Sequence, residues 1–322
     1  MAINSNIIHI KHCRLIFREP QISVTFKGVA YVLAFESDSF RSGKGVVVQG
    51  PSGVPVDHNF LLWLSVYFGE DFLNPSQEID TRYSYNRGAF SVGQRDIQRF
   101  MSAASRFPRS SHPKWKEQLI EYALIYFTMA LRSGLAYMPV TIGFFGVSLE
   151  CIGNIVHERP GDYQMLGALR FKELIKRRFA RYKRNPKTKA QIKVWQKHIE
   201  ADIELILLMR NMCYGHLQLH TVKGRMKIVS ALRDWYIRAG STKKHAAWMF
   251  KERRLELDLQ VNAASLYKVG LRTSRLLIFM ILGFSRSIPF STHDYLPMGD
   301  RVPGEVSEFE FNGKKFSITN TG

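Results

Sequence analysis

Apolar positions follow two different periods along the chain, and the change falls near residue 90. Before it, residues 21–26 alternate apolar and polar with period two, and 29–35 continue as an apolar run after Gly28, which together predict a hairpin. Residues 45–48 form a further strand candidate. Residues 60–68 are apolar almost throughout and fit either a buried strand or a short helix. The N-terminal part is therefore predicted to contain a β-sheet.

From residue 91 the apolar spacing becomes helical. A last segment, 308–318, alternates with period two around Asn312-Gly313, the strongest short hairpin signal in the chain. The sequence predicts an α+β fold with a mixed β-rich domain at 1–90, an α-helical domain at 91–288, and a C-terminal extension with a hairpin at 289–322. The predicted helices lie at 91–107, 114–131, 139–157, 188–210, 225–237, 242–257 and 259–284, and a further basic helix ends at Asn185-Pro186.

The stretch 203–216 carries the candidate chemistry. It is an apolar helix pattern that places Arg210 and then Asn211 near its end, followed by Gly215 and His216. A buried arginine is costly unless it meets an anion, so Arg210 needs a protein carboxylate or a ligand phosphate. Gly215 suits the left-handed residue that ends a helix, which lets His216 turn toward the arginine. An arginine that holds phosphate beside a histidine is a plausible pair for cleaving a phosphodiester.

Arg210-Asn211 and His216, with five residues between Arg210 and His216, resemble the Arg-polar…His signature of HEPN domains (higher eukaryotes and prokaryotes nucleotide-binding). The stretch 146–152, Gly-Val-Ser-Leu-Glu-Cys-Ile, is similar to the small-x-Leu-Glu-x-Leu helix of some HEPN subfamilies, with isoleucine at the last position. The resemblance covers roughly residues 92–285. One departure is Gly215, which precedes the histidine, whereas in many members a glycine follows it.

The resemblance implies an α-helical bundle with metal-independent endoribonuclease activity and no cofactor. It implies attack by the ribose 2′-OH on the adjacent phosphate, with His216 as general base or acid and Arg210 stabilising the phosphate charge. Asn211 would orient Arg210 or the phosphate. The family context further implies a homodimer, a toxin or antiviral (phage-defence) role, and an antitoxin or regulatory partner.

Glu150 is the one charged residue between Arg132 and Glu158. It can face solvent, or it can be a buried partner that fixes the guanidinium of Arg210 and offsets its burial.

The net charge of +19 is unevenly distributed. Residues 1–90 hold eight basic and eight acidic residues, so the whole excess lies in 91–322. Such an excess indicates a polyanionic partner, nucleic acid first and an anionic membrane second; a solvated basic surface or a contact with a partner protein is the alternative. Residues 172–197 contain eleven basic residues and a single acid, Glu173. The residues expected to contact RNA phosphates are Lys176, Arg177, Arg178, Arg181, Lys183 and Arg184.

Zinc binding is the main alternative chemistry for the same stretch. Cys213, His216 and His220 have a spacing that one helix could offer to zinc, but Gly215 interrupts it and no nearby acid completes a site. The pattern of a Walker loop, a dinucleotide-binding glycine motif or a serine-hydrolase elbow is absent from the sequence. The main rival function is a non-catalytic nucleic-acid-binding protein, and the second is a structural or membrane-surface protein.

Three scattered cysteines and an N-terminus without a basic or continuous apolar region predict a cytoplasmic protein. The longest uncharged run, 133–149, is shorter than the roughly 20 residues of a membrane span, so no membrane insertion is expected.

Overall fold

The computed structural model describes fifteen stretches of the chain. They are residues 7–10, 16–17, 21–36, 45–73, 91–92, 94–107, 114–134, 138–157, 171, 174–176, 186–212, 221–238, 263–283, 306–311 and 314–319.

The N-terminal sheet has four antiparallel strands in the order β1-β5-β4-β3. The strands are β1 (Ile7–Ile10), β3 (Gln21–Phe26), β4 (Val29–Glu36) and β5 (Gly45–Gln49). Strands β3 and β4 form the predicted hairpin, joined by Lys27 and Gly28 with φ of 48° and 80°. Positive φ at both central residues is the geometry of the tight turn that matches strand twist.

One face of this sheet is buried under α1 (His58–Phe68). Residues of β3 alternate between exposed and buried, as the period of the sequence predicts. The ring of Phe60 stacks on Tyr31 of β4, with centroids 3.9 Å apart. The segment 60–68 is thus helical. Asp57 caps its start by accepting the backbone N–H of Asn59 at 2.7 Å, and Gly69 closes its end in the left-handed conformation.

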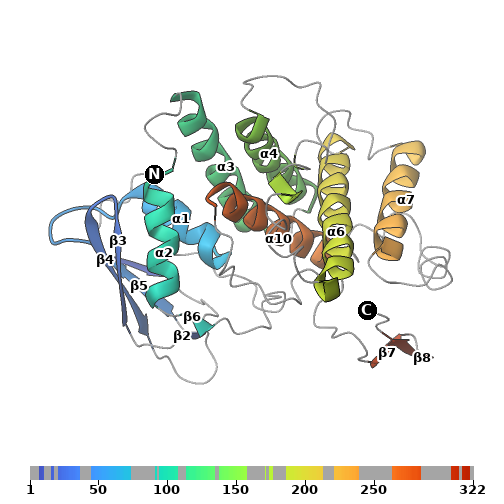
Figure 1. Ribbon diagram of the computed structural model, residues 1–322, viewed down its shortest axis with the longest axis horizontal. Coiled ribbons are helices and arrows are strands. Elements are labelled where there is room, and N and C mark those ends of the chain that lie inside the picture. Colours follow the sequence, from blue (N-terminus) through green and yellow to red (C-terminus); the bar gives the residue numbers. More distant parts are fainter. Residues whose placement is uncertain are drawn as a thin grey trace.

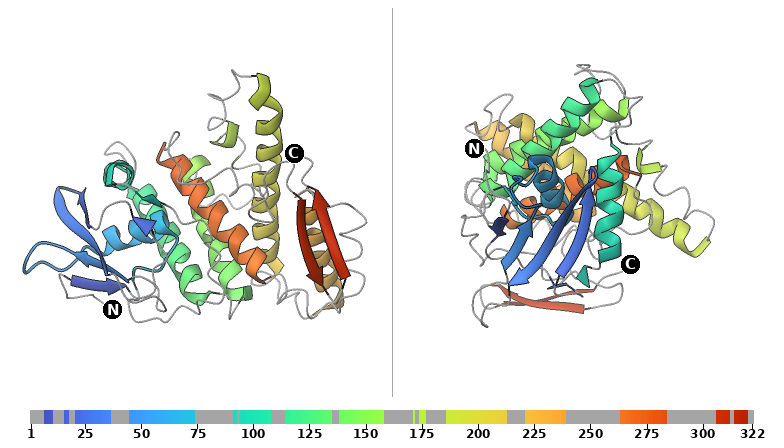
Figure 2. Two further views of the ribbon diagram at one scale, coloured as in Figure 1. Left: turned by 90° about the horizontal axis from the view of Figure 1, so that it is seen from below. Right: turned by 90° about the vertical axis from the view of Figure 1, so that its left-hand side faces the viewer.

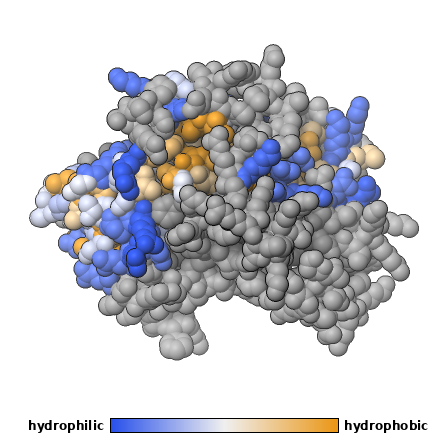
Figure 3. Space-filling model, viewed as in Figure 1, coloured by the Kyte–Doolittle hydropathy of each residue, from blue (hydrophilic) through white to orange (hydrophobic). Residues whose placement is uncertain are grey.

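Helix α2 (Gln94–Ser105) covers the open edge of β3. The Gln98 side chain takes the place of a neighbouring strand: its Oε1 accepts the N–H of Thr25 at 2.8 Å and its Nε2 donates to the Thr25 carbonyl at 3.2 Å. An unpaired strand edge is a template for aggregation, so this contact protects it. Figure 3 shows hydrophilic residues gathered over α2, on the side turned away from the core.

The remaining described helices form a bundle beside the sheet, as Figure 1 shows. Helix α4 packs against α3, α6 and α10, and α7 packs on α6. In Figures 1 and 2, α10 crosses the molecule between α3 and α6. The bounds of these helices are α3 Lys114–Ser133, α4 Met138–His157, α6 Pro186–Arg210, α7 Val222–Arg238 and α10 Ala263–Ile281.

The predicted fold class is confirmed: an N-terminal sheet, a helical part and a C-terminal hairpin, formed by β7 (Val306–Phe311) and β8 (Lys314–Thr319). The hairpin makes a two-stranded sheet of its own. The buried core runs continuously from the sheet into the helices, and the domain boundary near residue 90 stays a prediction.

Helix ends differ from the predictions in several places. Ser91–Val92 form β6, which pairs in parallel with β2 (Ile16–Phe17), so the helix expected from residue 91 begins at Gln94. Helix α6 begins at Pro186, whose fixed φ suits a first helical turn. The helix predicted at 242–257 lies outside the described residues.

Helix α4 is the one described segment long and apolar enough to cross a membrane, over Pro139–Val156. Within this segment 61% of the residues are buried inside the protein. Packing against α3, α6 and α10 accounts for this apolar sequence as that of a core helix. A cytoplasmic location stays a prediction.

Two buried arginines on α10 connect it to the rest of the fold. The Arg272 guanidinium meets the carboxylate of Asp202 on α6 at 2.7–3.0 Å. That carboxylate also accepts the indole N–H of Trp235 on α7 at 2.7 Å. One turn further, Arg275 donates to the carbonyls of Val66 and Tyr67 at the end of α1. These groups are charged or polar and buried, so each needs such a partner.

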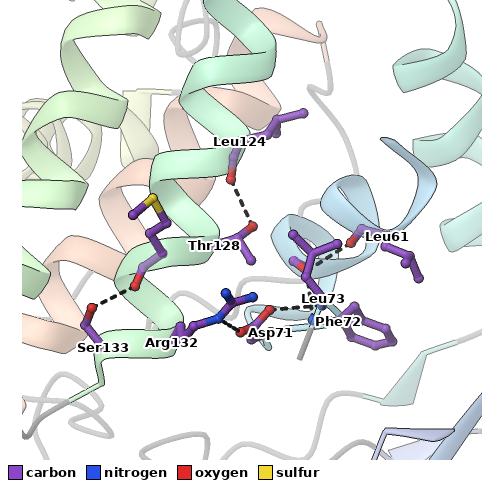
Figure 4. A network of polar contacts seen from close by, with 10 residues as sticks. Leu61, Asp71, Phe72, Leu73, Leu124, Thr128, Arg132 and Ser133 are labelled. Atoms are coloured by element: carbon purple, nitrogen blue, oxygen red, sulfur yellow. Dashed lines mark hydrogen bonds and ion pairs between the residues drawn. The ribbon is translucent and has the colours of Figure 1, made fainter. Parts of the chain in front are cut away.

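A second ion pair links Asp71, just after α1, to Arg132 of α3, as Figure 4 shows. Asp71 accepts the Arg132 Nε–H at 2.9 Å, and its other oxygen accepts the backbone N–H of Leu73. Because the side chain of Arg132 is 44% exposed, breaking this pair should cost less stability than breaking the buried pair at Asp202.

Replacing Asp202 with alanine should lower the free energy of unfolding by on the order of 3–5 kcal/mol, because it leaves Arg272 buried without its carboxylate. Urea denaturation measures the change. Asp234→Ala, at an exposed carboxylate on α7, is the matched control and should change stability by less than about 0.5 kcal/mol. Equal decreases in the two variants would contradict the role of the Asp202 network.

Candidate active site at the end of α6

The candidate site forms where the end of α6 meets the middle of α4. Arg210 is the last α-helical residue of α6, and Asn211 and Met212 continue it as a short π turn. The aliphatic stem of Arg210 lies directly over Gly146 of α4. A Cβ added at Gly146 would lie 2.5 Å from the Arg210 Cβ and 2.6 Å from its Cγ. Glycine is therefore what allows the two helices to approach this closely.

The head of Arg210 is held by two side-chain oxygens. Its Nη2 donates to Glu150 Oε2 at 2.5 Å, and its Nη1 donates to Asn211 Oδ1 at 2.7 Å. Glu150 lies one helical turn after Gly146, so the stem and the head of Arg210 run along the same face of α4. Short charge-assisted bonds of this kind fix the direction of a guanidinium.

The Arg210–Glu150 pair is neither fully buried nor fully exposed. The side chain of Arg210 is 26% exposed and that of Glu150 is 22% exposed. The bonds to Glu150 and Asn211 use two of the five N–H donors of a guanidinium. An anion can thus approach Arg210 without first breaking its ion pair with Glu150.

Cys151, next to Glu150 on α4, is buried. Burial, and then the negative charge of Glu150, raise the pKa of its thiol to about 11. The thiol therefore stays protonated at neutral pH, and Cys151 is a poor candidate for a nucleophile.

The structure brings together three of the four predicted catalytic residues: Arg210, Glu150 and Asn211. The fourth, His216, lies in 213–220, outside the described residues, together with Cys213 and His220 of the zinc alternative. Within the part of the chain that the structure describes, no three His, Cys, Asp or Glu side chains are grouped to hold a metal.

Among the predicted RNA-binding residues, Lys176 is described and exposed at the end of a short helical turn, 174–176. The other five lie outside the described residues: Arg177, Arg178, Arg181, Lys183 and Arg184.

Sequence reasoning missed the carboxylate of Asp202, which anchors α6 two turns before Arg210. The burial of Asp202 was readable from the sequence, because it lies three residues after Ile199 and four before Ile206, on the buried face of the helix. It also missed that Gly146 contacts the stem of Arg210, since nothing in either segment indicates which glycine meets which arginine.

Comparison of the chain with protein-family models, with curated protein sequences and with solved structures found no match. The resemblance to HEPN domains rests on the residues quoted for it, and the activity that it implies is a proposal.

Replacing Gly146 with alanine should destabilise the protein by about 1–3 kcal/mol, although alanine favours a helix more than glycine does. The added methyl would clash with Cβ and Cγ of Arg210, which are close to the backbone and cannot move away as the end of a side chain can. The free energy of unfolding in urea measures this.

The double variant Gly146→Ala/Arg210→Gly supplies the control. Removing the Arg210 side chain should remove most of the cost of Gly146→Ala relative to Arg210→Gly alone. A Gly146→Ala protein as stable as the parent chain would contradict the close contact.

Proposed function

We propose that the protein is a metal-independent endoribonuclease whose cutting site contains Arg210 and His216. The proposal rests on the group of side chains around Arg210 at the end of α6. Arg210 is partly exposed, is aimed by Glu150 and Asn211, and stands six positions before the histidine in the sequence. A preorganised guanidinium with donors to spare is suited to the charge that develops on a phosphate during cleavage.

The proposed reaction uses the RNA itself as nucleophile. The 2′-OH oxygen attacks the adjacent phosphorus while His216 takes its proton, and the 5′-oxygen of the next nucleotide leaves and receives a proton. A 2′,3′-cyclic phosphate and a 5′-hydroxyl result. Arg210 stabilises the additional negative charge on the phosphate, and no step requires a metal ion.

Glu150 and Asn211 act as positioning residues in this scheme. The Glu150 carboxylate keeps the Arg210 head on the α4 side and offsets the cost of its partial burial. The same negative charge opposes an incoming phosphate, so Glu150 tunes how strongly Arg210 holds RNA. Its neutral isostere should therefore alter both binding and rate.

A homodimer, a toxin or antiviral role, and an antitoxin or regulatory partner are proposed on the resemblance alone. The second candidate function is non-catalytic nucleic-acid binding. It is favoured by the basic excess of residues 91–322, which needs no catalytic histidine to attract RNA.

Incubation of the protein with single-stranded RNA in EDTA tests the proposal. The parent chain should cut the RNA and leave cyclic phosphate or 3′-phosphate ends, detected by gel mobility and end-group analysis. Arg210→Ala and His216→Ala should each reduce the rate by on the order of 100-fold or more.

Arg99→Ala, at an exposed arginine of α2, is the control and should cut at the parental rate. Full activity of both site variants would refute the assignment. Activity that EDTA abolishes would favour the metal alternative. RNA binding with no products from the parent chain would leave the binding-only function.

The basic segment should contribute to binding and not to the chemical step. Replacing Lys176, Arg177, Arg178, Arg181, Lys183 and Arg184 with glutamine should weaken RNA binding about equally for different sequences. The slope of log affinity against log salt should flatten by up to about 0.7 for each phosphate that the variant no longer neutralises. Cleavage at saturating RNA should persist. An unchanged salt slope would show that this segment is only a solvated surface.

A further inference from the structure

The outward side of α7 carries a stripe of exposed side chains. They recur at intervals of three and four residues, which confines them to an arc of about 120° around the helix. The stripe, here called the α7 outer face, consists of Lys223, Met226, Lys227, Ser230, Arg233 and Asp234.

The opposite side of α7 is fixed to the protein. Leu232 and Trp235 are buried, at 0% and 3% exposure. The indole N–H of Trp235 donates to Asp202 of α6 at 2.7 Å, which sets the rotation of α7 about its own axis. These contacts therefore fix which side of α7 faces solvent, and that side is the α7 outer face.

Charge on this face is predominantly positive. Lys223, Lys227 and Arg233 are basic, and Asp234 is the one acid among the six side chains. Its carboxylate lies 3.9 Å from the Arg233 Nε. This ion pair is long and exposed, so it neutralises little of the arginine's charge. The two lysines are four residues apart, so they project side by side from successive turns.

An exposed methionine lies within this basic face. Met226 is 58% exposed, the highest exposure among the large apolar side chains that the structure describes. Its thioether is flexible and polarizable, and such sulfurs make favourable contacts with aromatic rings. A nucleobase offers that kind of ring. Figure 3 shows hydrophilic residues at the right-hand edge of the molecule, where α7 lies in Figure 1.

A membrane surface fits this face less well than a nucleic acid does. A helix that binds a membrane inserts an apolar face into the lipid. In α7 that face, with Leu232 and Trp235, is already buried against the protein. The outward side offers one apolar side chain among cations. This combination suits a nucleic-acid strand, because each nucleotide carries both a phosphate and a base.

We propose that the α7 outer face binds single-stranded nucleic acid, with Lys223 and Lys227 on phosphates and Met226 against a base. The inference rests on the proposed function only in taking RNA as the natural ligand. Contacts to phosphate carry no sequence information, so the face serves affinity and placement of the strand. It adds a surface on α7, whereas Arg210 lies at the end of α6.

The test measures binding of single-stranded DNA of mixed sequence, which lacks the 2′-OH and is not cut by the proposed reaction. Its outcome is therefore independent of whether the protein cleaves RNA. Lys223→Gln/Lys227→Gln should weaken binding and flatten the slope of log affinity against log salt by up to about 1.4, from two phosphate contacts. Met226→Ser should weaken binding while leaving the salt slope unchanged.

Arg95→Gln/Arg99→Gln on α2 is the matched control, because it removes two exposed charges at the same four-residue spacing. It should leave the salt slope close to that of the parent chain. Equal effects of the two pairs would overturn the proposal, since overall charge would then explain both. So would loss of binding to phosphatidylserine vesicles, with DNA binding unchanged, in the α7 variants. Retained urea stability confirms that the fold is intact.

Discussion

The burial of two arginines one turn apart on α10 is the constraint on which the helical part depends. Moving a guanidinium out of water is costly, so each must meet an anion or several carbonyl oxygens. Arg272 meets the carboxylate of Asp202, and Arg275 meets the buried carbonyls of Val66 and Tyr67 at the end of α1. Because the partners lie on different elements, satisfying both fixes α10 against α6 and against the helix that covers the sheet.

The position of the candidate site follows from this arrangement. Asp202 anchors α6 two turns before its end, and α4 approaches that end closely because Gly146 has no side chain. The stem of Arg210 then runs along α4 until its head meets Glu150. The pair is only partly buried, so the arginine is aimed by the fold and still accessible to an anion. The proposed chemistry requires this combination, because a fully buried arginine would not reach a phosphate.

In the proposed function, attraction of RNA and action on its phosphate fall to different basic residues. The basic excess lies beyond residue 90, in the same part of the chain as Arg210. The lysines of the α7 outer face project from a helix that Trp235 holds in place, so the fold fixes the side of the protein on which their positive charge lies. Long-range attraction by such surfaces raises the rate of encounter with a polyanion, whereas a single preorganised arginine acts only at the phosphate that it contacts.

The sequence by itself determined the strands and helices that have a clear local period. The period of two at 21–26 and its interruption at Gly28 predict the hairpin, and the helical spacing of 114–131 predicts α3 to within two residues at its end. These features depend on neighbours a few positions apart, so local chemistry suffices. The short strand at Ser91–Val92 was missed because its partner, β2, is about 75 positions away.

Only the tertiary structure decided which distant groups meet. From the sequence, Glu150 was equally suited to solvent and to Arg210; the packing of α4 on α6 places its oxygen 2.5 Å from the guanidinium. The pairing of Asp202 with Arg272, 70 positions apart, has no local signal at all. A charged side chain in an apolar stretch indicates that a partner must exist, because burial without one is too costly. Which partner it meets depends on how the helices pack, and this packing depends on contacts throughout the core.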